Sequence, residues 1–333
     1  MKRIVCYTSF LFILLFFCNQ FAASQRFAAK RFRGKKSKEY KITIDQKERT
    51  YHLFVPSDSK EMAPNKKLPF VFVLHGGGRS GRSQKAQQLE RFTKFSALAE
   101  KEGFIVCYPE GYQGNWNDGR GVEGIPAHKE NIDDVKFFRE IVKEVSKKHQ
   151  VDQSRIFSTG ISNGGFMSHR LAAEASDMIA AIAPLVGGMA EPIAKKFKPK
   201  YPVSLFIIQG DSDPLVPIDG GEVGYKRGKK RGKVISTNDA IAKYVKHNSI
   251  QGKPTKTTLK DKAPNDGTTT QKTVYPPSKE GVKVQLYVIK NGGHTWPGRP
   301  LYAPEFFIGK VSKDFDATEE IWKFFKSCPP RKK

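Results

Sequence analysis

The sequence predicts an α/β protein in which a mostly parallel central sheet carries helices on both faces. Continuous apolar runs end in glycine at 68–78, 104–111 and 203–210, and such runs are typical of strands buried on both faces. Segments with apolar residues at helical spacing alternate with these runs. This β-α-β-α order predicts parallel strands joined by helical crossovers, with the ligand beyond the carboxyl ends of the strands.

The first elements of the predicted domain are a hairpin, a buried strand and a helix. Residues 40–45 and 50–55 predict an antiparallel hairpin that enters the sheet. After the apolar run that begins at residue 68, apolar residues at helical spacing extend from Leu89 to Ala99, and Gly103 is the expected end of that helix.

The remaining elements continue the alternation of strands and helices. After the second buried strand, residues 111–130 are rich in Gly, Asn and Trp and predict a loop, and Asp133 is the expected N-cap of the next helix. The strand RIFSTG (155–160) follows, and then a helix from Asn163. Further strands are expected at 180–188, 203–210 and 282–290, and helices at about 236–247 and 316–326.

Residues 1–24 have the pattern of a signal peptide. Lys2 and Arg3 precede the apolar run IVCYTSFLFILLFF, and the small residues Ala22, Ala23 and Ser24 precede the cleavage that we expect after Ser24. An uncleaved membrane anchor is the alternative, but the run is short for a membrane span. We therefore expect a secreted protein, extracellular or periplasmic, with no membrane span in the mature chain.

The chain is strongly basic, with a formal net charge of +25. Seven Lys or Arg residues lie in 25–38, here the N-terminal basic tail, and six lie in 226–233, here the basic loop; neither segment has an acidic residue. No nucleic-acid-binding motif accompanies them, so we expect no nucleic-acid partner. We interpret both segments as solvated basic surface that can attract an anionic surface or glycan.

The cysteines leave one question open. Cys107 lies in a buried-strand pattern and Cys328 lies near the C-terminus. An exported protein permits a disulfide between them, and a buried free thiol at Cys107 is the other interpretation. Neither cysteine has the spacing of a zinc site, and the glycines at 76–78 lack the spacing of a dinucleotide-binding fingerprint. We therefore expect no metal and no cofactor.

The segment RIFSTGISNGGF places Ser162 on a tight corner between a strand and a helix. Residues 160–164 match G-x-S-x-G, in which a sharp turn lifts the serine hydroxyl above the sheet. The same turn places the Asn163 N–H and the helix N-terminus where an oxyanion would form. An ordinary glycine-rich turn is the alternative interpretation of this pentapeptide.

A nucleophilic serine requires a base and an acid that orients the base, and in this fold their chain order is serine, acid, histidine. Two histidines follow Ser162: His247 lies in a helical pattern, whereas His294 follows a strand on a glycine-rich loop. We therefore predict His294 as the base. Asp211 and Asp213 both follow a strand, and we predict Asp213, deeper in the loop, as the acid, with Asp211 holding the turn.

Further site residues lie in other loops at the same edge of the sheet. The HGGG motif at 75–78 predicts a second oxyanion donor, which we place at Gly77, while its histidine is structural. Trp116, Asn117 and Trp296 are predicted to bind substrate as walls of an acyl or leaving-group pocket. Packing beneath a loop is the alternative interpretation of both tryptophans.

Several long stretches resemble the extracellular esterase family that includes polyhydroxybutyrate depolymerases and feruloyl or acetylxylan esterases. In chain order over residues 40–327 they are VLHGGG, YPEGYQGNWNDGR, DDVKFFREIV, VDQSRIFSTGISNGGFMSHRLA, QGDSDPLVP, NGGHTWPG and DFDATEEIWKFF. The resemblance implies an α/β-hydrolase fold over 39–328, a catalytic triad and two oxyanion donors, at Ser162, Asp213, His294, Gly77 and Asn163. The chain departs from the family pattern at Gln209, where histidine is common, and in the basic loop.

The resemblance implies a serine carboxylic-ester hydrolase. Its ester substrate would be a polyester oligomer of the hydroxybutyrate type or a feruloyl or acetyl ester of plant polysaccharide. Two alternatives stay open: a serine peptidase with the same triad, and a non-catalytic glycan-binding protein on a hydrolase scaffold. A fluorophosphonate probe separates the last from an enzyme, because a scaffold without an activated serine is not labelled.

Overall fold

A sheet of ten strands runs through the part of the chain described by the structure, a computed structural model covering residues 36–57, 66–78 and 85–332. The expected signal peptide and residues 25–35 of the N-terminal basic tail lie outside the described residues. The strands are β1 (Lys38–Ile44), β2 (Lys47–Phe54), β3 (Leu68–Leu74), β4 (Ile105–Pro109), β5 (Val151–Ile161), β6 (Ala181–Leu185), β7 (Ser204–Gly210), β10 (Thr255–Thr258), β11 (Thr269–Val274) and β12 (Val284–Lys290).

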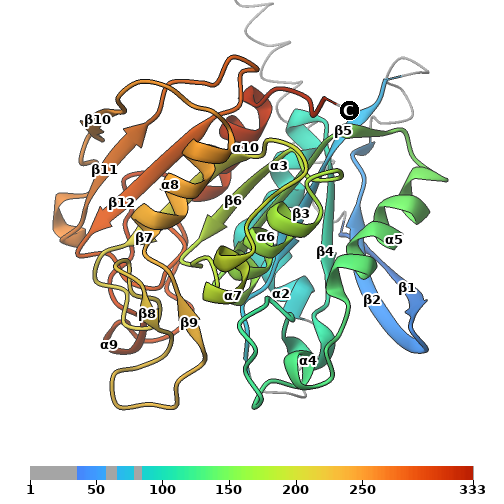
Figure 1. The fold of residues 1–333 in the computed structure, drawn as a ribbon, viewed down its shortest axis with the longest axis horizontal. Coiled ribbons are helices and arrows are strands. Elements are labelled where there is room, and N and C mark those ends of the chain that lie inside the picture. Colours follow the sequence, from blue (N-terminus) through green and yellow to red (C-terminus); the bar gives the residue numbers. More distant parts are fainter. Residues whose placement is uncertain (1–35, 58–65, 79–84, 333) are drawn as a thin grey trace, which may run out of the picture. The chain divides into compact units, whose positions relative to one another are not determined.

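The strand order is β1-β2-β4-β3-β5-β6-β7-β12-β11-β10 (Figure 1). The central strands from β4 to β12 pair in parallel, and antiparallel pairs form both edges. Because parallel strands end at one edge, the loops after β3, β4, β5, β7 and β12 meet there. The predicted fold class, an α/β protein with a mostly parallel sheet, is confirmed.

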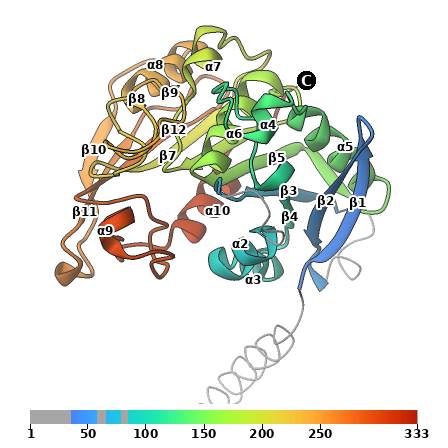
Figure 2. The same ribbon diagram turned by 90° about the horizontal axis from the view of Figure 1, so that it is seen from below.

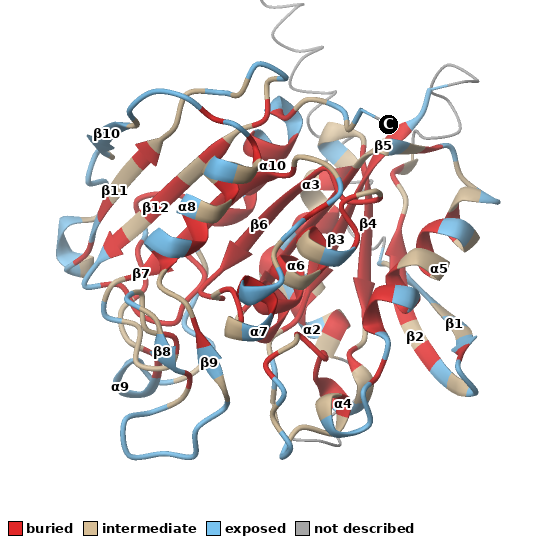
Figure 3. Ribbon diagram, in the orientation of Figure 1, coloured by how far each residue is buried: buried red, intermediate tan, exposed pale blue. Residues whose placement is uncertain are grey.

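Helices cover both faces of the sheet (Figure 2). On one face lie α5 (Asp134–Ser146), α6 (Asn163–Glu174) and α8 (Thr237–His247). On the other lie α2 (Lys85–Thr93), α3 (Phe95–Glu102) and α10 (Ala317–Ser327). Strand side chains alternate between two buried clusters, so Phe70 and Phe72 of β3 join the first and Val71 and Val73 join the second. Strands β3 and β7 are accordingly buried along their whole length (Figure 3).

Side-chain caps begin two of the predicted helices, one of them at the expected N-cap Asp133. Asp133 accepts a hydrogen bond from the Lys136 N–H at 2.8 Å at the start of α5. Ser236 accepts one from the Asp239 N–H at 3.0 Å at the start of α8. Each cap satisfies an N–H group that has no partner inside its helix.

The helix predicted through Leu89 and Ala99 is two helices, α2 and α3, and this part of the prediction is wrong. Lys94 separates them with φ at 61°, a left-handed conformation. The preceding carbonyl, of Thr93, accepts a hydrogen bond from the buried Thr318 hydroxyl at 2.8 Å. Apolar spacing continues across the break, so the sequence pattern does not reveal it.

Several short or exposed elements were not predicted from the sequence. Strand β10 has the sequence TKTT and is exposed throughout, so it has no alternation of polarity to reveal it. The others are β11, the two-residue strands β8 (Gly221–Glu222) and β9 (Lys233–Val234), and the short helices α4 (Pro126–Lys129), α7 (Glu191–Lys195) and α9 (Glu305–Ile308). Among the described residues, no helix is both long and apolar enough to cross a membrane.

The disulfide left open by the sequence is absent, since Cys107 and Cys328 are both free buried thiols. Cys107 belongs to the buried cluster on one face of the sheet and Cys328 to the cluster on the other, so the sheet separates them. Burial raises the pKa of the Cys107 thiol well above its usual range and that of Cys328 to about 12. Both are core side chains and not reactive thiolates.

Candidate active site

Ser162 occupies a strained corner between β5 and α6, with φ at 56° and ψ at −120°. Leu74 of strand β3 passes directly beneath this corner. A Cβ atom would lie 2.6 Å from the Leu74 carbonyl oxygen at Gly160 and 2.4 Å from it at Gly164, so both positions require glycine. A conformation of this kind costs about 1–3 kcal/mol and is typical of functional sites. It places Ser162 in the lining of a pocket.

A histidine and a carboxylate meet beside this pocket. The Nδ1 atom of His294 lies 2.7 Å from Oδ2 of Asp213, and their side chains are 3% and 0% exposed. The other carboxylate oxygen of Asp213 accepts the N–H groups of Leu215 at 2.8 Å and Val216 at 2.9 Å. These bonds fix the carboxylate, so His294 donates through Nδ1 and its Nε2 remains available as a base.

The loop that carries His294 is held by close packing. A Cβ atom at Gly293 would lie 2.0 Å from the Ile308 carbonyl oxygen, so only glycine allows this approach. The Tyr302 hydroxyl donates a hydrogen bond to the His294 carbonyl at 2.6 Å. Burial raises the pKa of Tyr302 above its usual range, so this hydroxyl keeps its proton.

The competing candidates have other partners. Asp211 accepts a hydrogen bond from the Asn291 N–H at 2.7 Å and pairs with Lys290 at 3.2 Å, which joins the ends of β7 and β12. His247 lies at the end of α8, with Nε2 3.4 Å from the Tyr201 carbonyl oxygen. Neither contacts the His294 side chain through a hydrogen bond in the described part of the chain.

The pocket has a volume of about 760 Å³ and opens at the carboxyl ends of the strands. Its walls are largely apolar or aromatic, with Lys85 and Arg231 adding positive charge. The lining residues beyond the HGGG motif, Ser162 and His294 are Lys85, Gln88, Leu89, Phe92, Ile161, Leu215, Tyr225, Arg231, Tyr302 and Ile308. A second cavity of about 660 Å³, near the amino ends of β6 and β7, contains His247 but neither Ser162 nor His294.

The two predicted oxyanion donors are neighbours. A Cβ atom at Gly77 would lie 3.3 Å from Cβ of Asn163 and 2.8 Å from Oδ1 of Asn115. Asn115 also accepts the Gly78 N–H at 3.3 Å and donates to the Gly78 carbonyl at 3.0 Å, which holds the glycine loop. Asn163 is the first residue of α6, where an N–H has no acceptor inside the helix.

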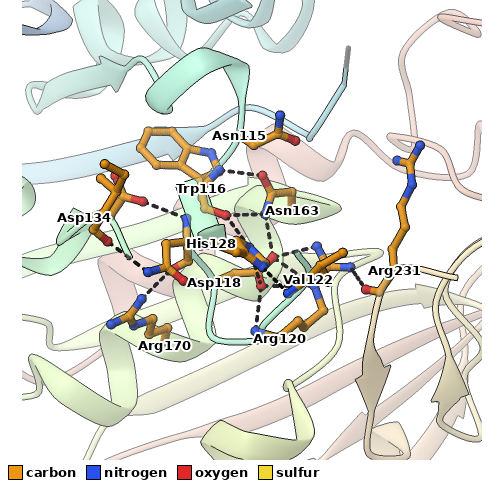
Figure 4. A network of polar contacts seen from close by, with 12 residues as sticks. Asn115, Trp116, Asp118, Arg120, Val122, His128, Asp134, Asn163, Arg170 and Arg231 are labelled. Carbon is orange, nitrogen blue, oxygen red and sulfur yellow. Dashed lines mark hydrogen bonds and ion pairs between the residues drawn. The ribbon is translucent and has the colours of Figure 1, made fainter. Parts of the chain in front are cut away.

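A buried polar network holds the Asn163 side chain (Figure 4). Its Oδ1 accepts the Trp116 N–H at 2.8 Å, and its amide donates to the Trp116 carbonyl at 3.2 Å and to the Asp118 carboxylate. Asp118 pairs with Arg120 at 2.7 Å, and their side chains are 0% and 3% exposed. Asp118 and Arg120 were not predicted as site residues, although both lie in NWNDGR (115–120), within one of the stretches that carry the family resemblance.

His75 has the structural role predicted for it. Burial lowers its pKa to about 3, so the ring is neutral. Its Nε2 accepts the Gly111 N–H at 2.9 Å, and its Nδ1 therefore donates to the Gly76 carbonyl at 2.9 Å. The ring fastens the glycine motif to the loop after β4.

The predicted substrate contacts of Trp116, Asn117 and Trp296 are corrected by the structure. Both tryptophans are almost fully buried. The indole N–H of Trp116 donates to the His75 carbonyl at 3.0 Å, and that of Trp296 donates to the Thr318 hydroxyl at 3.2 Å. Asn117 is also buried and donates within its own loop. None of the three lines the pocket, so packing beneath a loop is the interpretation that holds.

The described residues contain no group of three or more His, Cys, Asp or Glu side chains arranged to hold a metal ion.

A buried ion pair also lies near this site. Burial raises the pKa of Asp134, and its carboxylate pairs with Arg49 at 2.7 Å. It accepts the Asn117 N–H at 2.7 Å and so anchors the loop beneath the pocket.

Comparison with known proteins defines the class of this protein. An acetyl xylan esterase from Aspergillus awamori has a TM-score of 0.56 over 87% of this chain and 100% of its own, at 13% identity. That likeness shows the α/β-hydrolase fold. Together with the sequence relatives that follow, it makes the chain a carboxylic-ester hydrolase of this fold.

Residues 49–194 match the model described as Esterase PHB depolymerase. A protein named as an esterase, NocK of Nocardia uniformis subsp. tsuyamanensis, is 28% identical over 84% of this chain and 79% of its own. Feruloyl esterase B of Piromyces equi is 32% identical over 63% of this chain, and the match spans 37% of its length. The resemblance inferred from the sequence is confirmed.

Proposed function

We propose that this protein is a secreted serine esterase that uses Ser162 as nucleophile, His294 as base and Asp213 as the acid that orients His294. The observation that carries the proposal is the 2.7 Å contact between His294 Nδ1 and Asp213 Oδ2, next to the pocket that Ser162 also lines. That contact fixes the imidazole tautomer in which Nε2 can take the proton of a serine hydroxyl.

The reaction follows from these roles. Ser162 Oγ attacks the ester carbonyl while His294 Nε2 takes its proton, and the N–H groups of Gly77 and Asn163 bind the tetrahedral oxyanion. Each such donor contributes about 3 kcal/mol in comparable sites. His294 then protonates the leaving alcohol, and water hydrolyses the acyl-enzyme by the same proton transfers in reverse. No step requires a metal or a cofactor.

The proposed substrates are feruloyl or acetyl esters of plant polysaccharide, or polyester oligomers of the hydroxybutyrate type. Relatives named as a feruloyl esterase and an acetyl xylan esterase support the first, and the family described as Esterase PHB depolymerase supports the second. A mainly apolar and aromatic pocket of about 760 Å³ suits an acyl group of either kind.

The secreted location is proposed from the N-terminal pattern alone. Lys2 and Arg3, the apolar run and the small residues up to Ser24 form the leader, and the esterase domain follows the N-terminal basic tail. N-terminal sequencing of the protein recovered from the culture medium or periplasm tests this, with Gln25 expected as the first residue.

The test of the activity is hydrolysis of an ester panel by wild type and Ser162→Ala. The panel contains nitrophenyl acetate, butyrate and octanoate, methyl ferulate, acetylated xylan and hydroxybutyrate oligomers. We expect wild type to hydrolyse members of the panel and Ser162→Ala to lose turnover while keeping its circular dichroism spectrum. Ser212→Ala is the matched control, because Ser212 is exposed in the neighbouring loop and should remain active. Wild-type activity in Ser162→Ala would refute the proposal.

A further inference from the structure

We propose that the pocket favours esters that carry a carboxylate over neutral esters of the same size, and that Arg231, assisted by Lys85, binds this group. The inference rests on the proposed function, because it assigns the substrate class of the same pocket. Both side chains line the pocket with Ser162 and His294, and no Asp or Glu is among the described residues that line it.

The backbone of Arg231 is fixed although its side chain is exposed. Its N–H donates to the Val223 carbonyl at 2.9 Å, and its carbonyl accepts from Nη1 of Arg120 at 2.8 Å. The following residue, Gly232, has φ at 81°, and a Cβ there would lie 3.0 Å from Cβ of Arg120. The end of the basic loop is therefore held against Arg120 at a defined position.

The same Arg120 also connects Arg231 to the oxyanion region. Arg120 pairs with Asp118, and Asp118 accepts from the side chain of Asn163, the residue that follows the nucleophile (Figure 4). Figure 4 shows the Arg231 side chain extending away from this network while its carbonyl stays bonded to Arg120. This chain of hydrogen bonds therefore connects the backbone of Arg231 to Asn163, a proposed oxyanion donor.

The Arg231 guanidinium forms no ion pair within residues 36–57, 66–78 and 85–332. A guanidinium at a pocket wall offers a planar pair of donors that fits a carboxylate. In the same loop, by contrast, Lys230 donates to the carbonyls of Tyr225 and Lys226 at 3.1 and 3.2 Å and so supports the loop itself.

Lys85 supplies the second positive charge beside the HGGG motif. Its Nζ donates to the Gly114 carbonyl at 2.6 Å, and a Cβ at Gly78 would lie 2.9 Å from that Nζ. Its positive charge, at the wall of the pocket, attracts a substrate carboxylate. The charge therefore lies one residue from the proposed oxyanion donor Gly77.

The whole chain reinforces this local charge. The net charge of +25 falls only to +23 without Lys2 and Arg3 of the leader, and it produces a positive potential that attracts anions and that low-dielectric pocket walls concentrate. An ester with a carboxylate on its acyl or its alcohol part would gain both faster association and a charge-assisted hydrogen bond. A neutral ester of the same size would gain neither.

The test compares matched anionic and neutral esters in wild type, Arg231→Gln and Arg227→Gln. One pair is 4-acetoxybenzoate and its methyl ester, with the carboxylate on the alcohol part. The other pair is mono-(4-nitrophenyl) adipate and 4-nitrophenyl hexanoate, with the carboxylate on the acyl part. Arg227 is the control because it lies in the basic loop, is exposed and does not line the pocket.

We expect Arg231→Gln to lower kcat/KM for at least one anionic ester by about tenfold or more, the usual effect of losing a hydrogen bond to a charged group. Its neutral partner and the Arg227→Gln control should change by less than about twofold, as for exposed charges away from the ligand. The pair that responds tells which part of the ester meets Arg231.

Equal changes for the anionic and neutral members of both pairs would overturn the inference while leaving the esterase assignment intact. If wild type hydrolyses none of the four esters, the proposed function is overturned, and this inference with it. Salt gives an independent readout, because only the anionic esters should lose kcat/KM as ionic strength rises and screens the attraction.

Discussion

Asp213 illustrates how the chain prepares a reactive group before substrate arrives. Its carboxylate accepts two backbone N–H groups and faces His294 Nδ1, with its side chain fully buried. The carboxylate therefore cannot rotate away when His294 gains a proton, and it stabilises the imidazolium that forms. The chain order of serine, acid and histidine identified this residue, whereas the neighbouring Asp211 was separated from it only by depth in the loop.

Asp213→Asn should lower kcat by about three to four orders of magnitude, as in comparable triads. The amide can donate to Nδ1 and so select the tautomer that leaves no base facing Ser162. Initial rates with nitrophenyl butyrate measure the effect, and unfolding in urea checks that the fold remains. Asp211→Asn is the control and should retain at least a tenth of wild-type kcat. A fully active Asp213→Asn variant would exclude Asp213 as the orienting acid.

The packing of the elements around Ser162 depends on close contacts between their backbones. Strand β3 passes below the junction of β5 and α6, and the G-x-S-x-G pattern reveals the need for small residues there. The loop that holds Trp116 and Asp118 gives a weaker signal. A tryptophan after a strand end is equally consistent with a pocket wall and with packing beneath a loop. Only the three-dimensional path of the loop shows that the Trp116 indole N–H donates a hydrogen bond to the HGGG segment.

Gly164→Ala should destabilise the protein by at least about 2 kcal/mol, because the new methyl group would meet the Leu74 carbonyl at 2.4 Å and force the backbone to move. The free energy of unfolding in urea is the measurement. Gly76→Ala is the matched control, since the nearest atoms to a Cβ there are 3.5 Å away and ordinary contact results. Equal stability of the two variants would contradict the packing of this corner.

Across the whole molecule, apolar patterns predicted what lies in the core and missed what lies at the rim. The buried strands β3 and β7 were evident because both of their faces are apolar. Exposed β10 and the two-residue strands carry no such pattern. The link from Asp118 through Arg120 to the basic loop could not be predicted either, because Arg120 and Arg231 are 111 residues apart in the chain.

Buried neutral histidines make the stability of the whole molecule depend on pH. The folded pKa of His75 is about 3, below the unfolded value near 6.5. Between these values the unfolded chain binds a proton that the folded chain does not, so stability is present above about pH 6.5 and is lost as pH falls toward 3. One such group contributes a slope of about 1.4 kcal/mol per pH unit.

His75→Gln should therefore be less stable than wild type at pH 7, yet its stability should fall less steeply between pH 6 and pH 4. Glutamine removes the titrating ring while the carboxylates and other histidines remain, so the difference between the two slopes isolates His75. Urea unfolding at half-unit pH intervals measures both slopes. Parallel curves for the two proteins would show that His75 is not kept neutral by burial.

The central claim is that Ser162 is an activated nucleophile. The most direct measurement is to react the native protein with a fluorophosphonate and locate the adduct by peptide mass spectrometry. We expect a single modification on Ser162 in wild type, and greatly slowed labelling in His294→Ala, because the serine then lacks its base. No adduct on native protein, or an adduct on another serine, would contradict this account of the site.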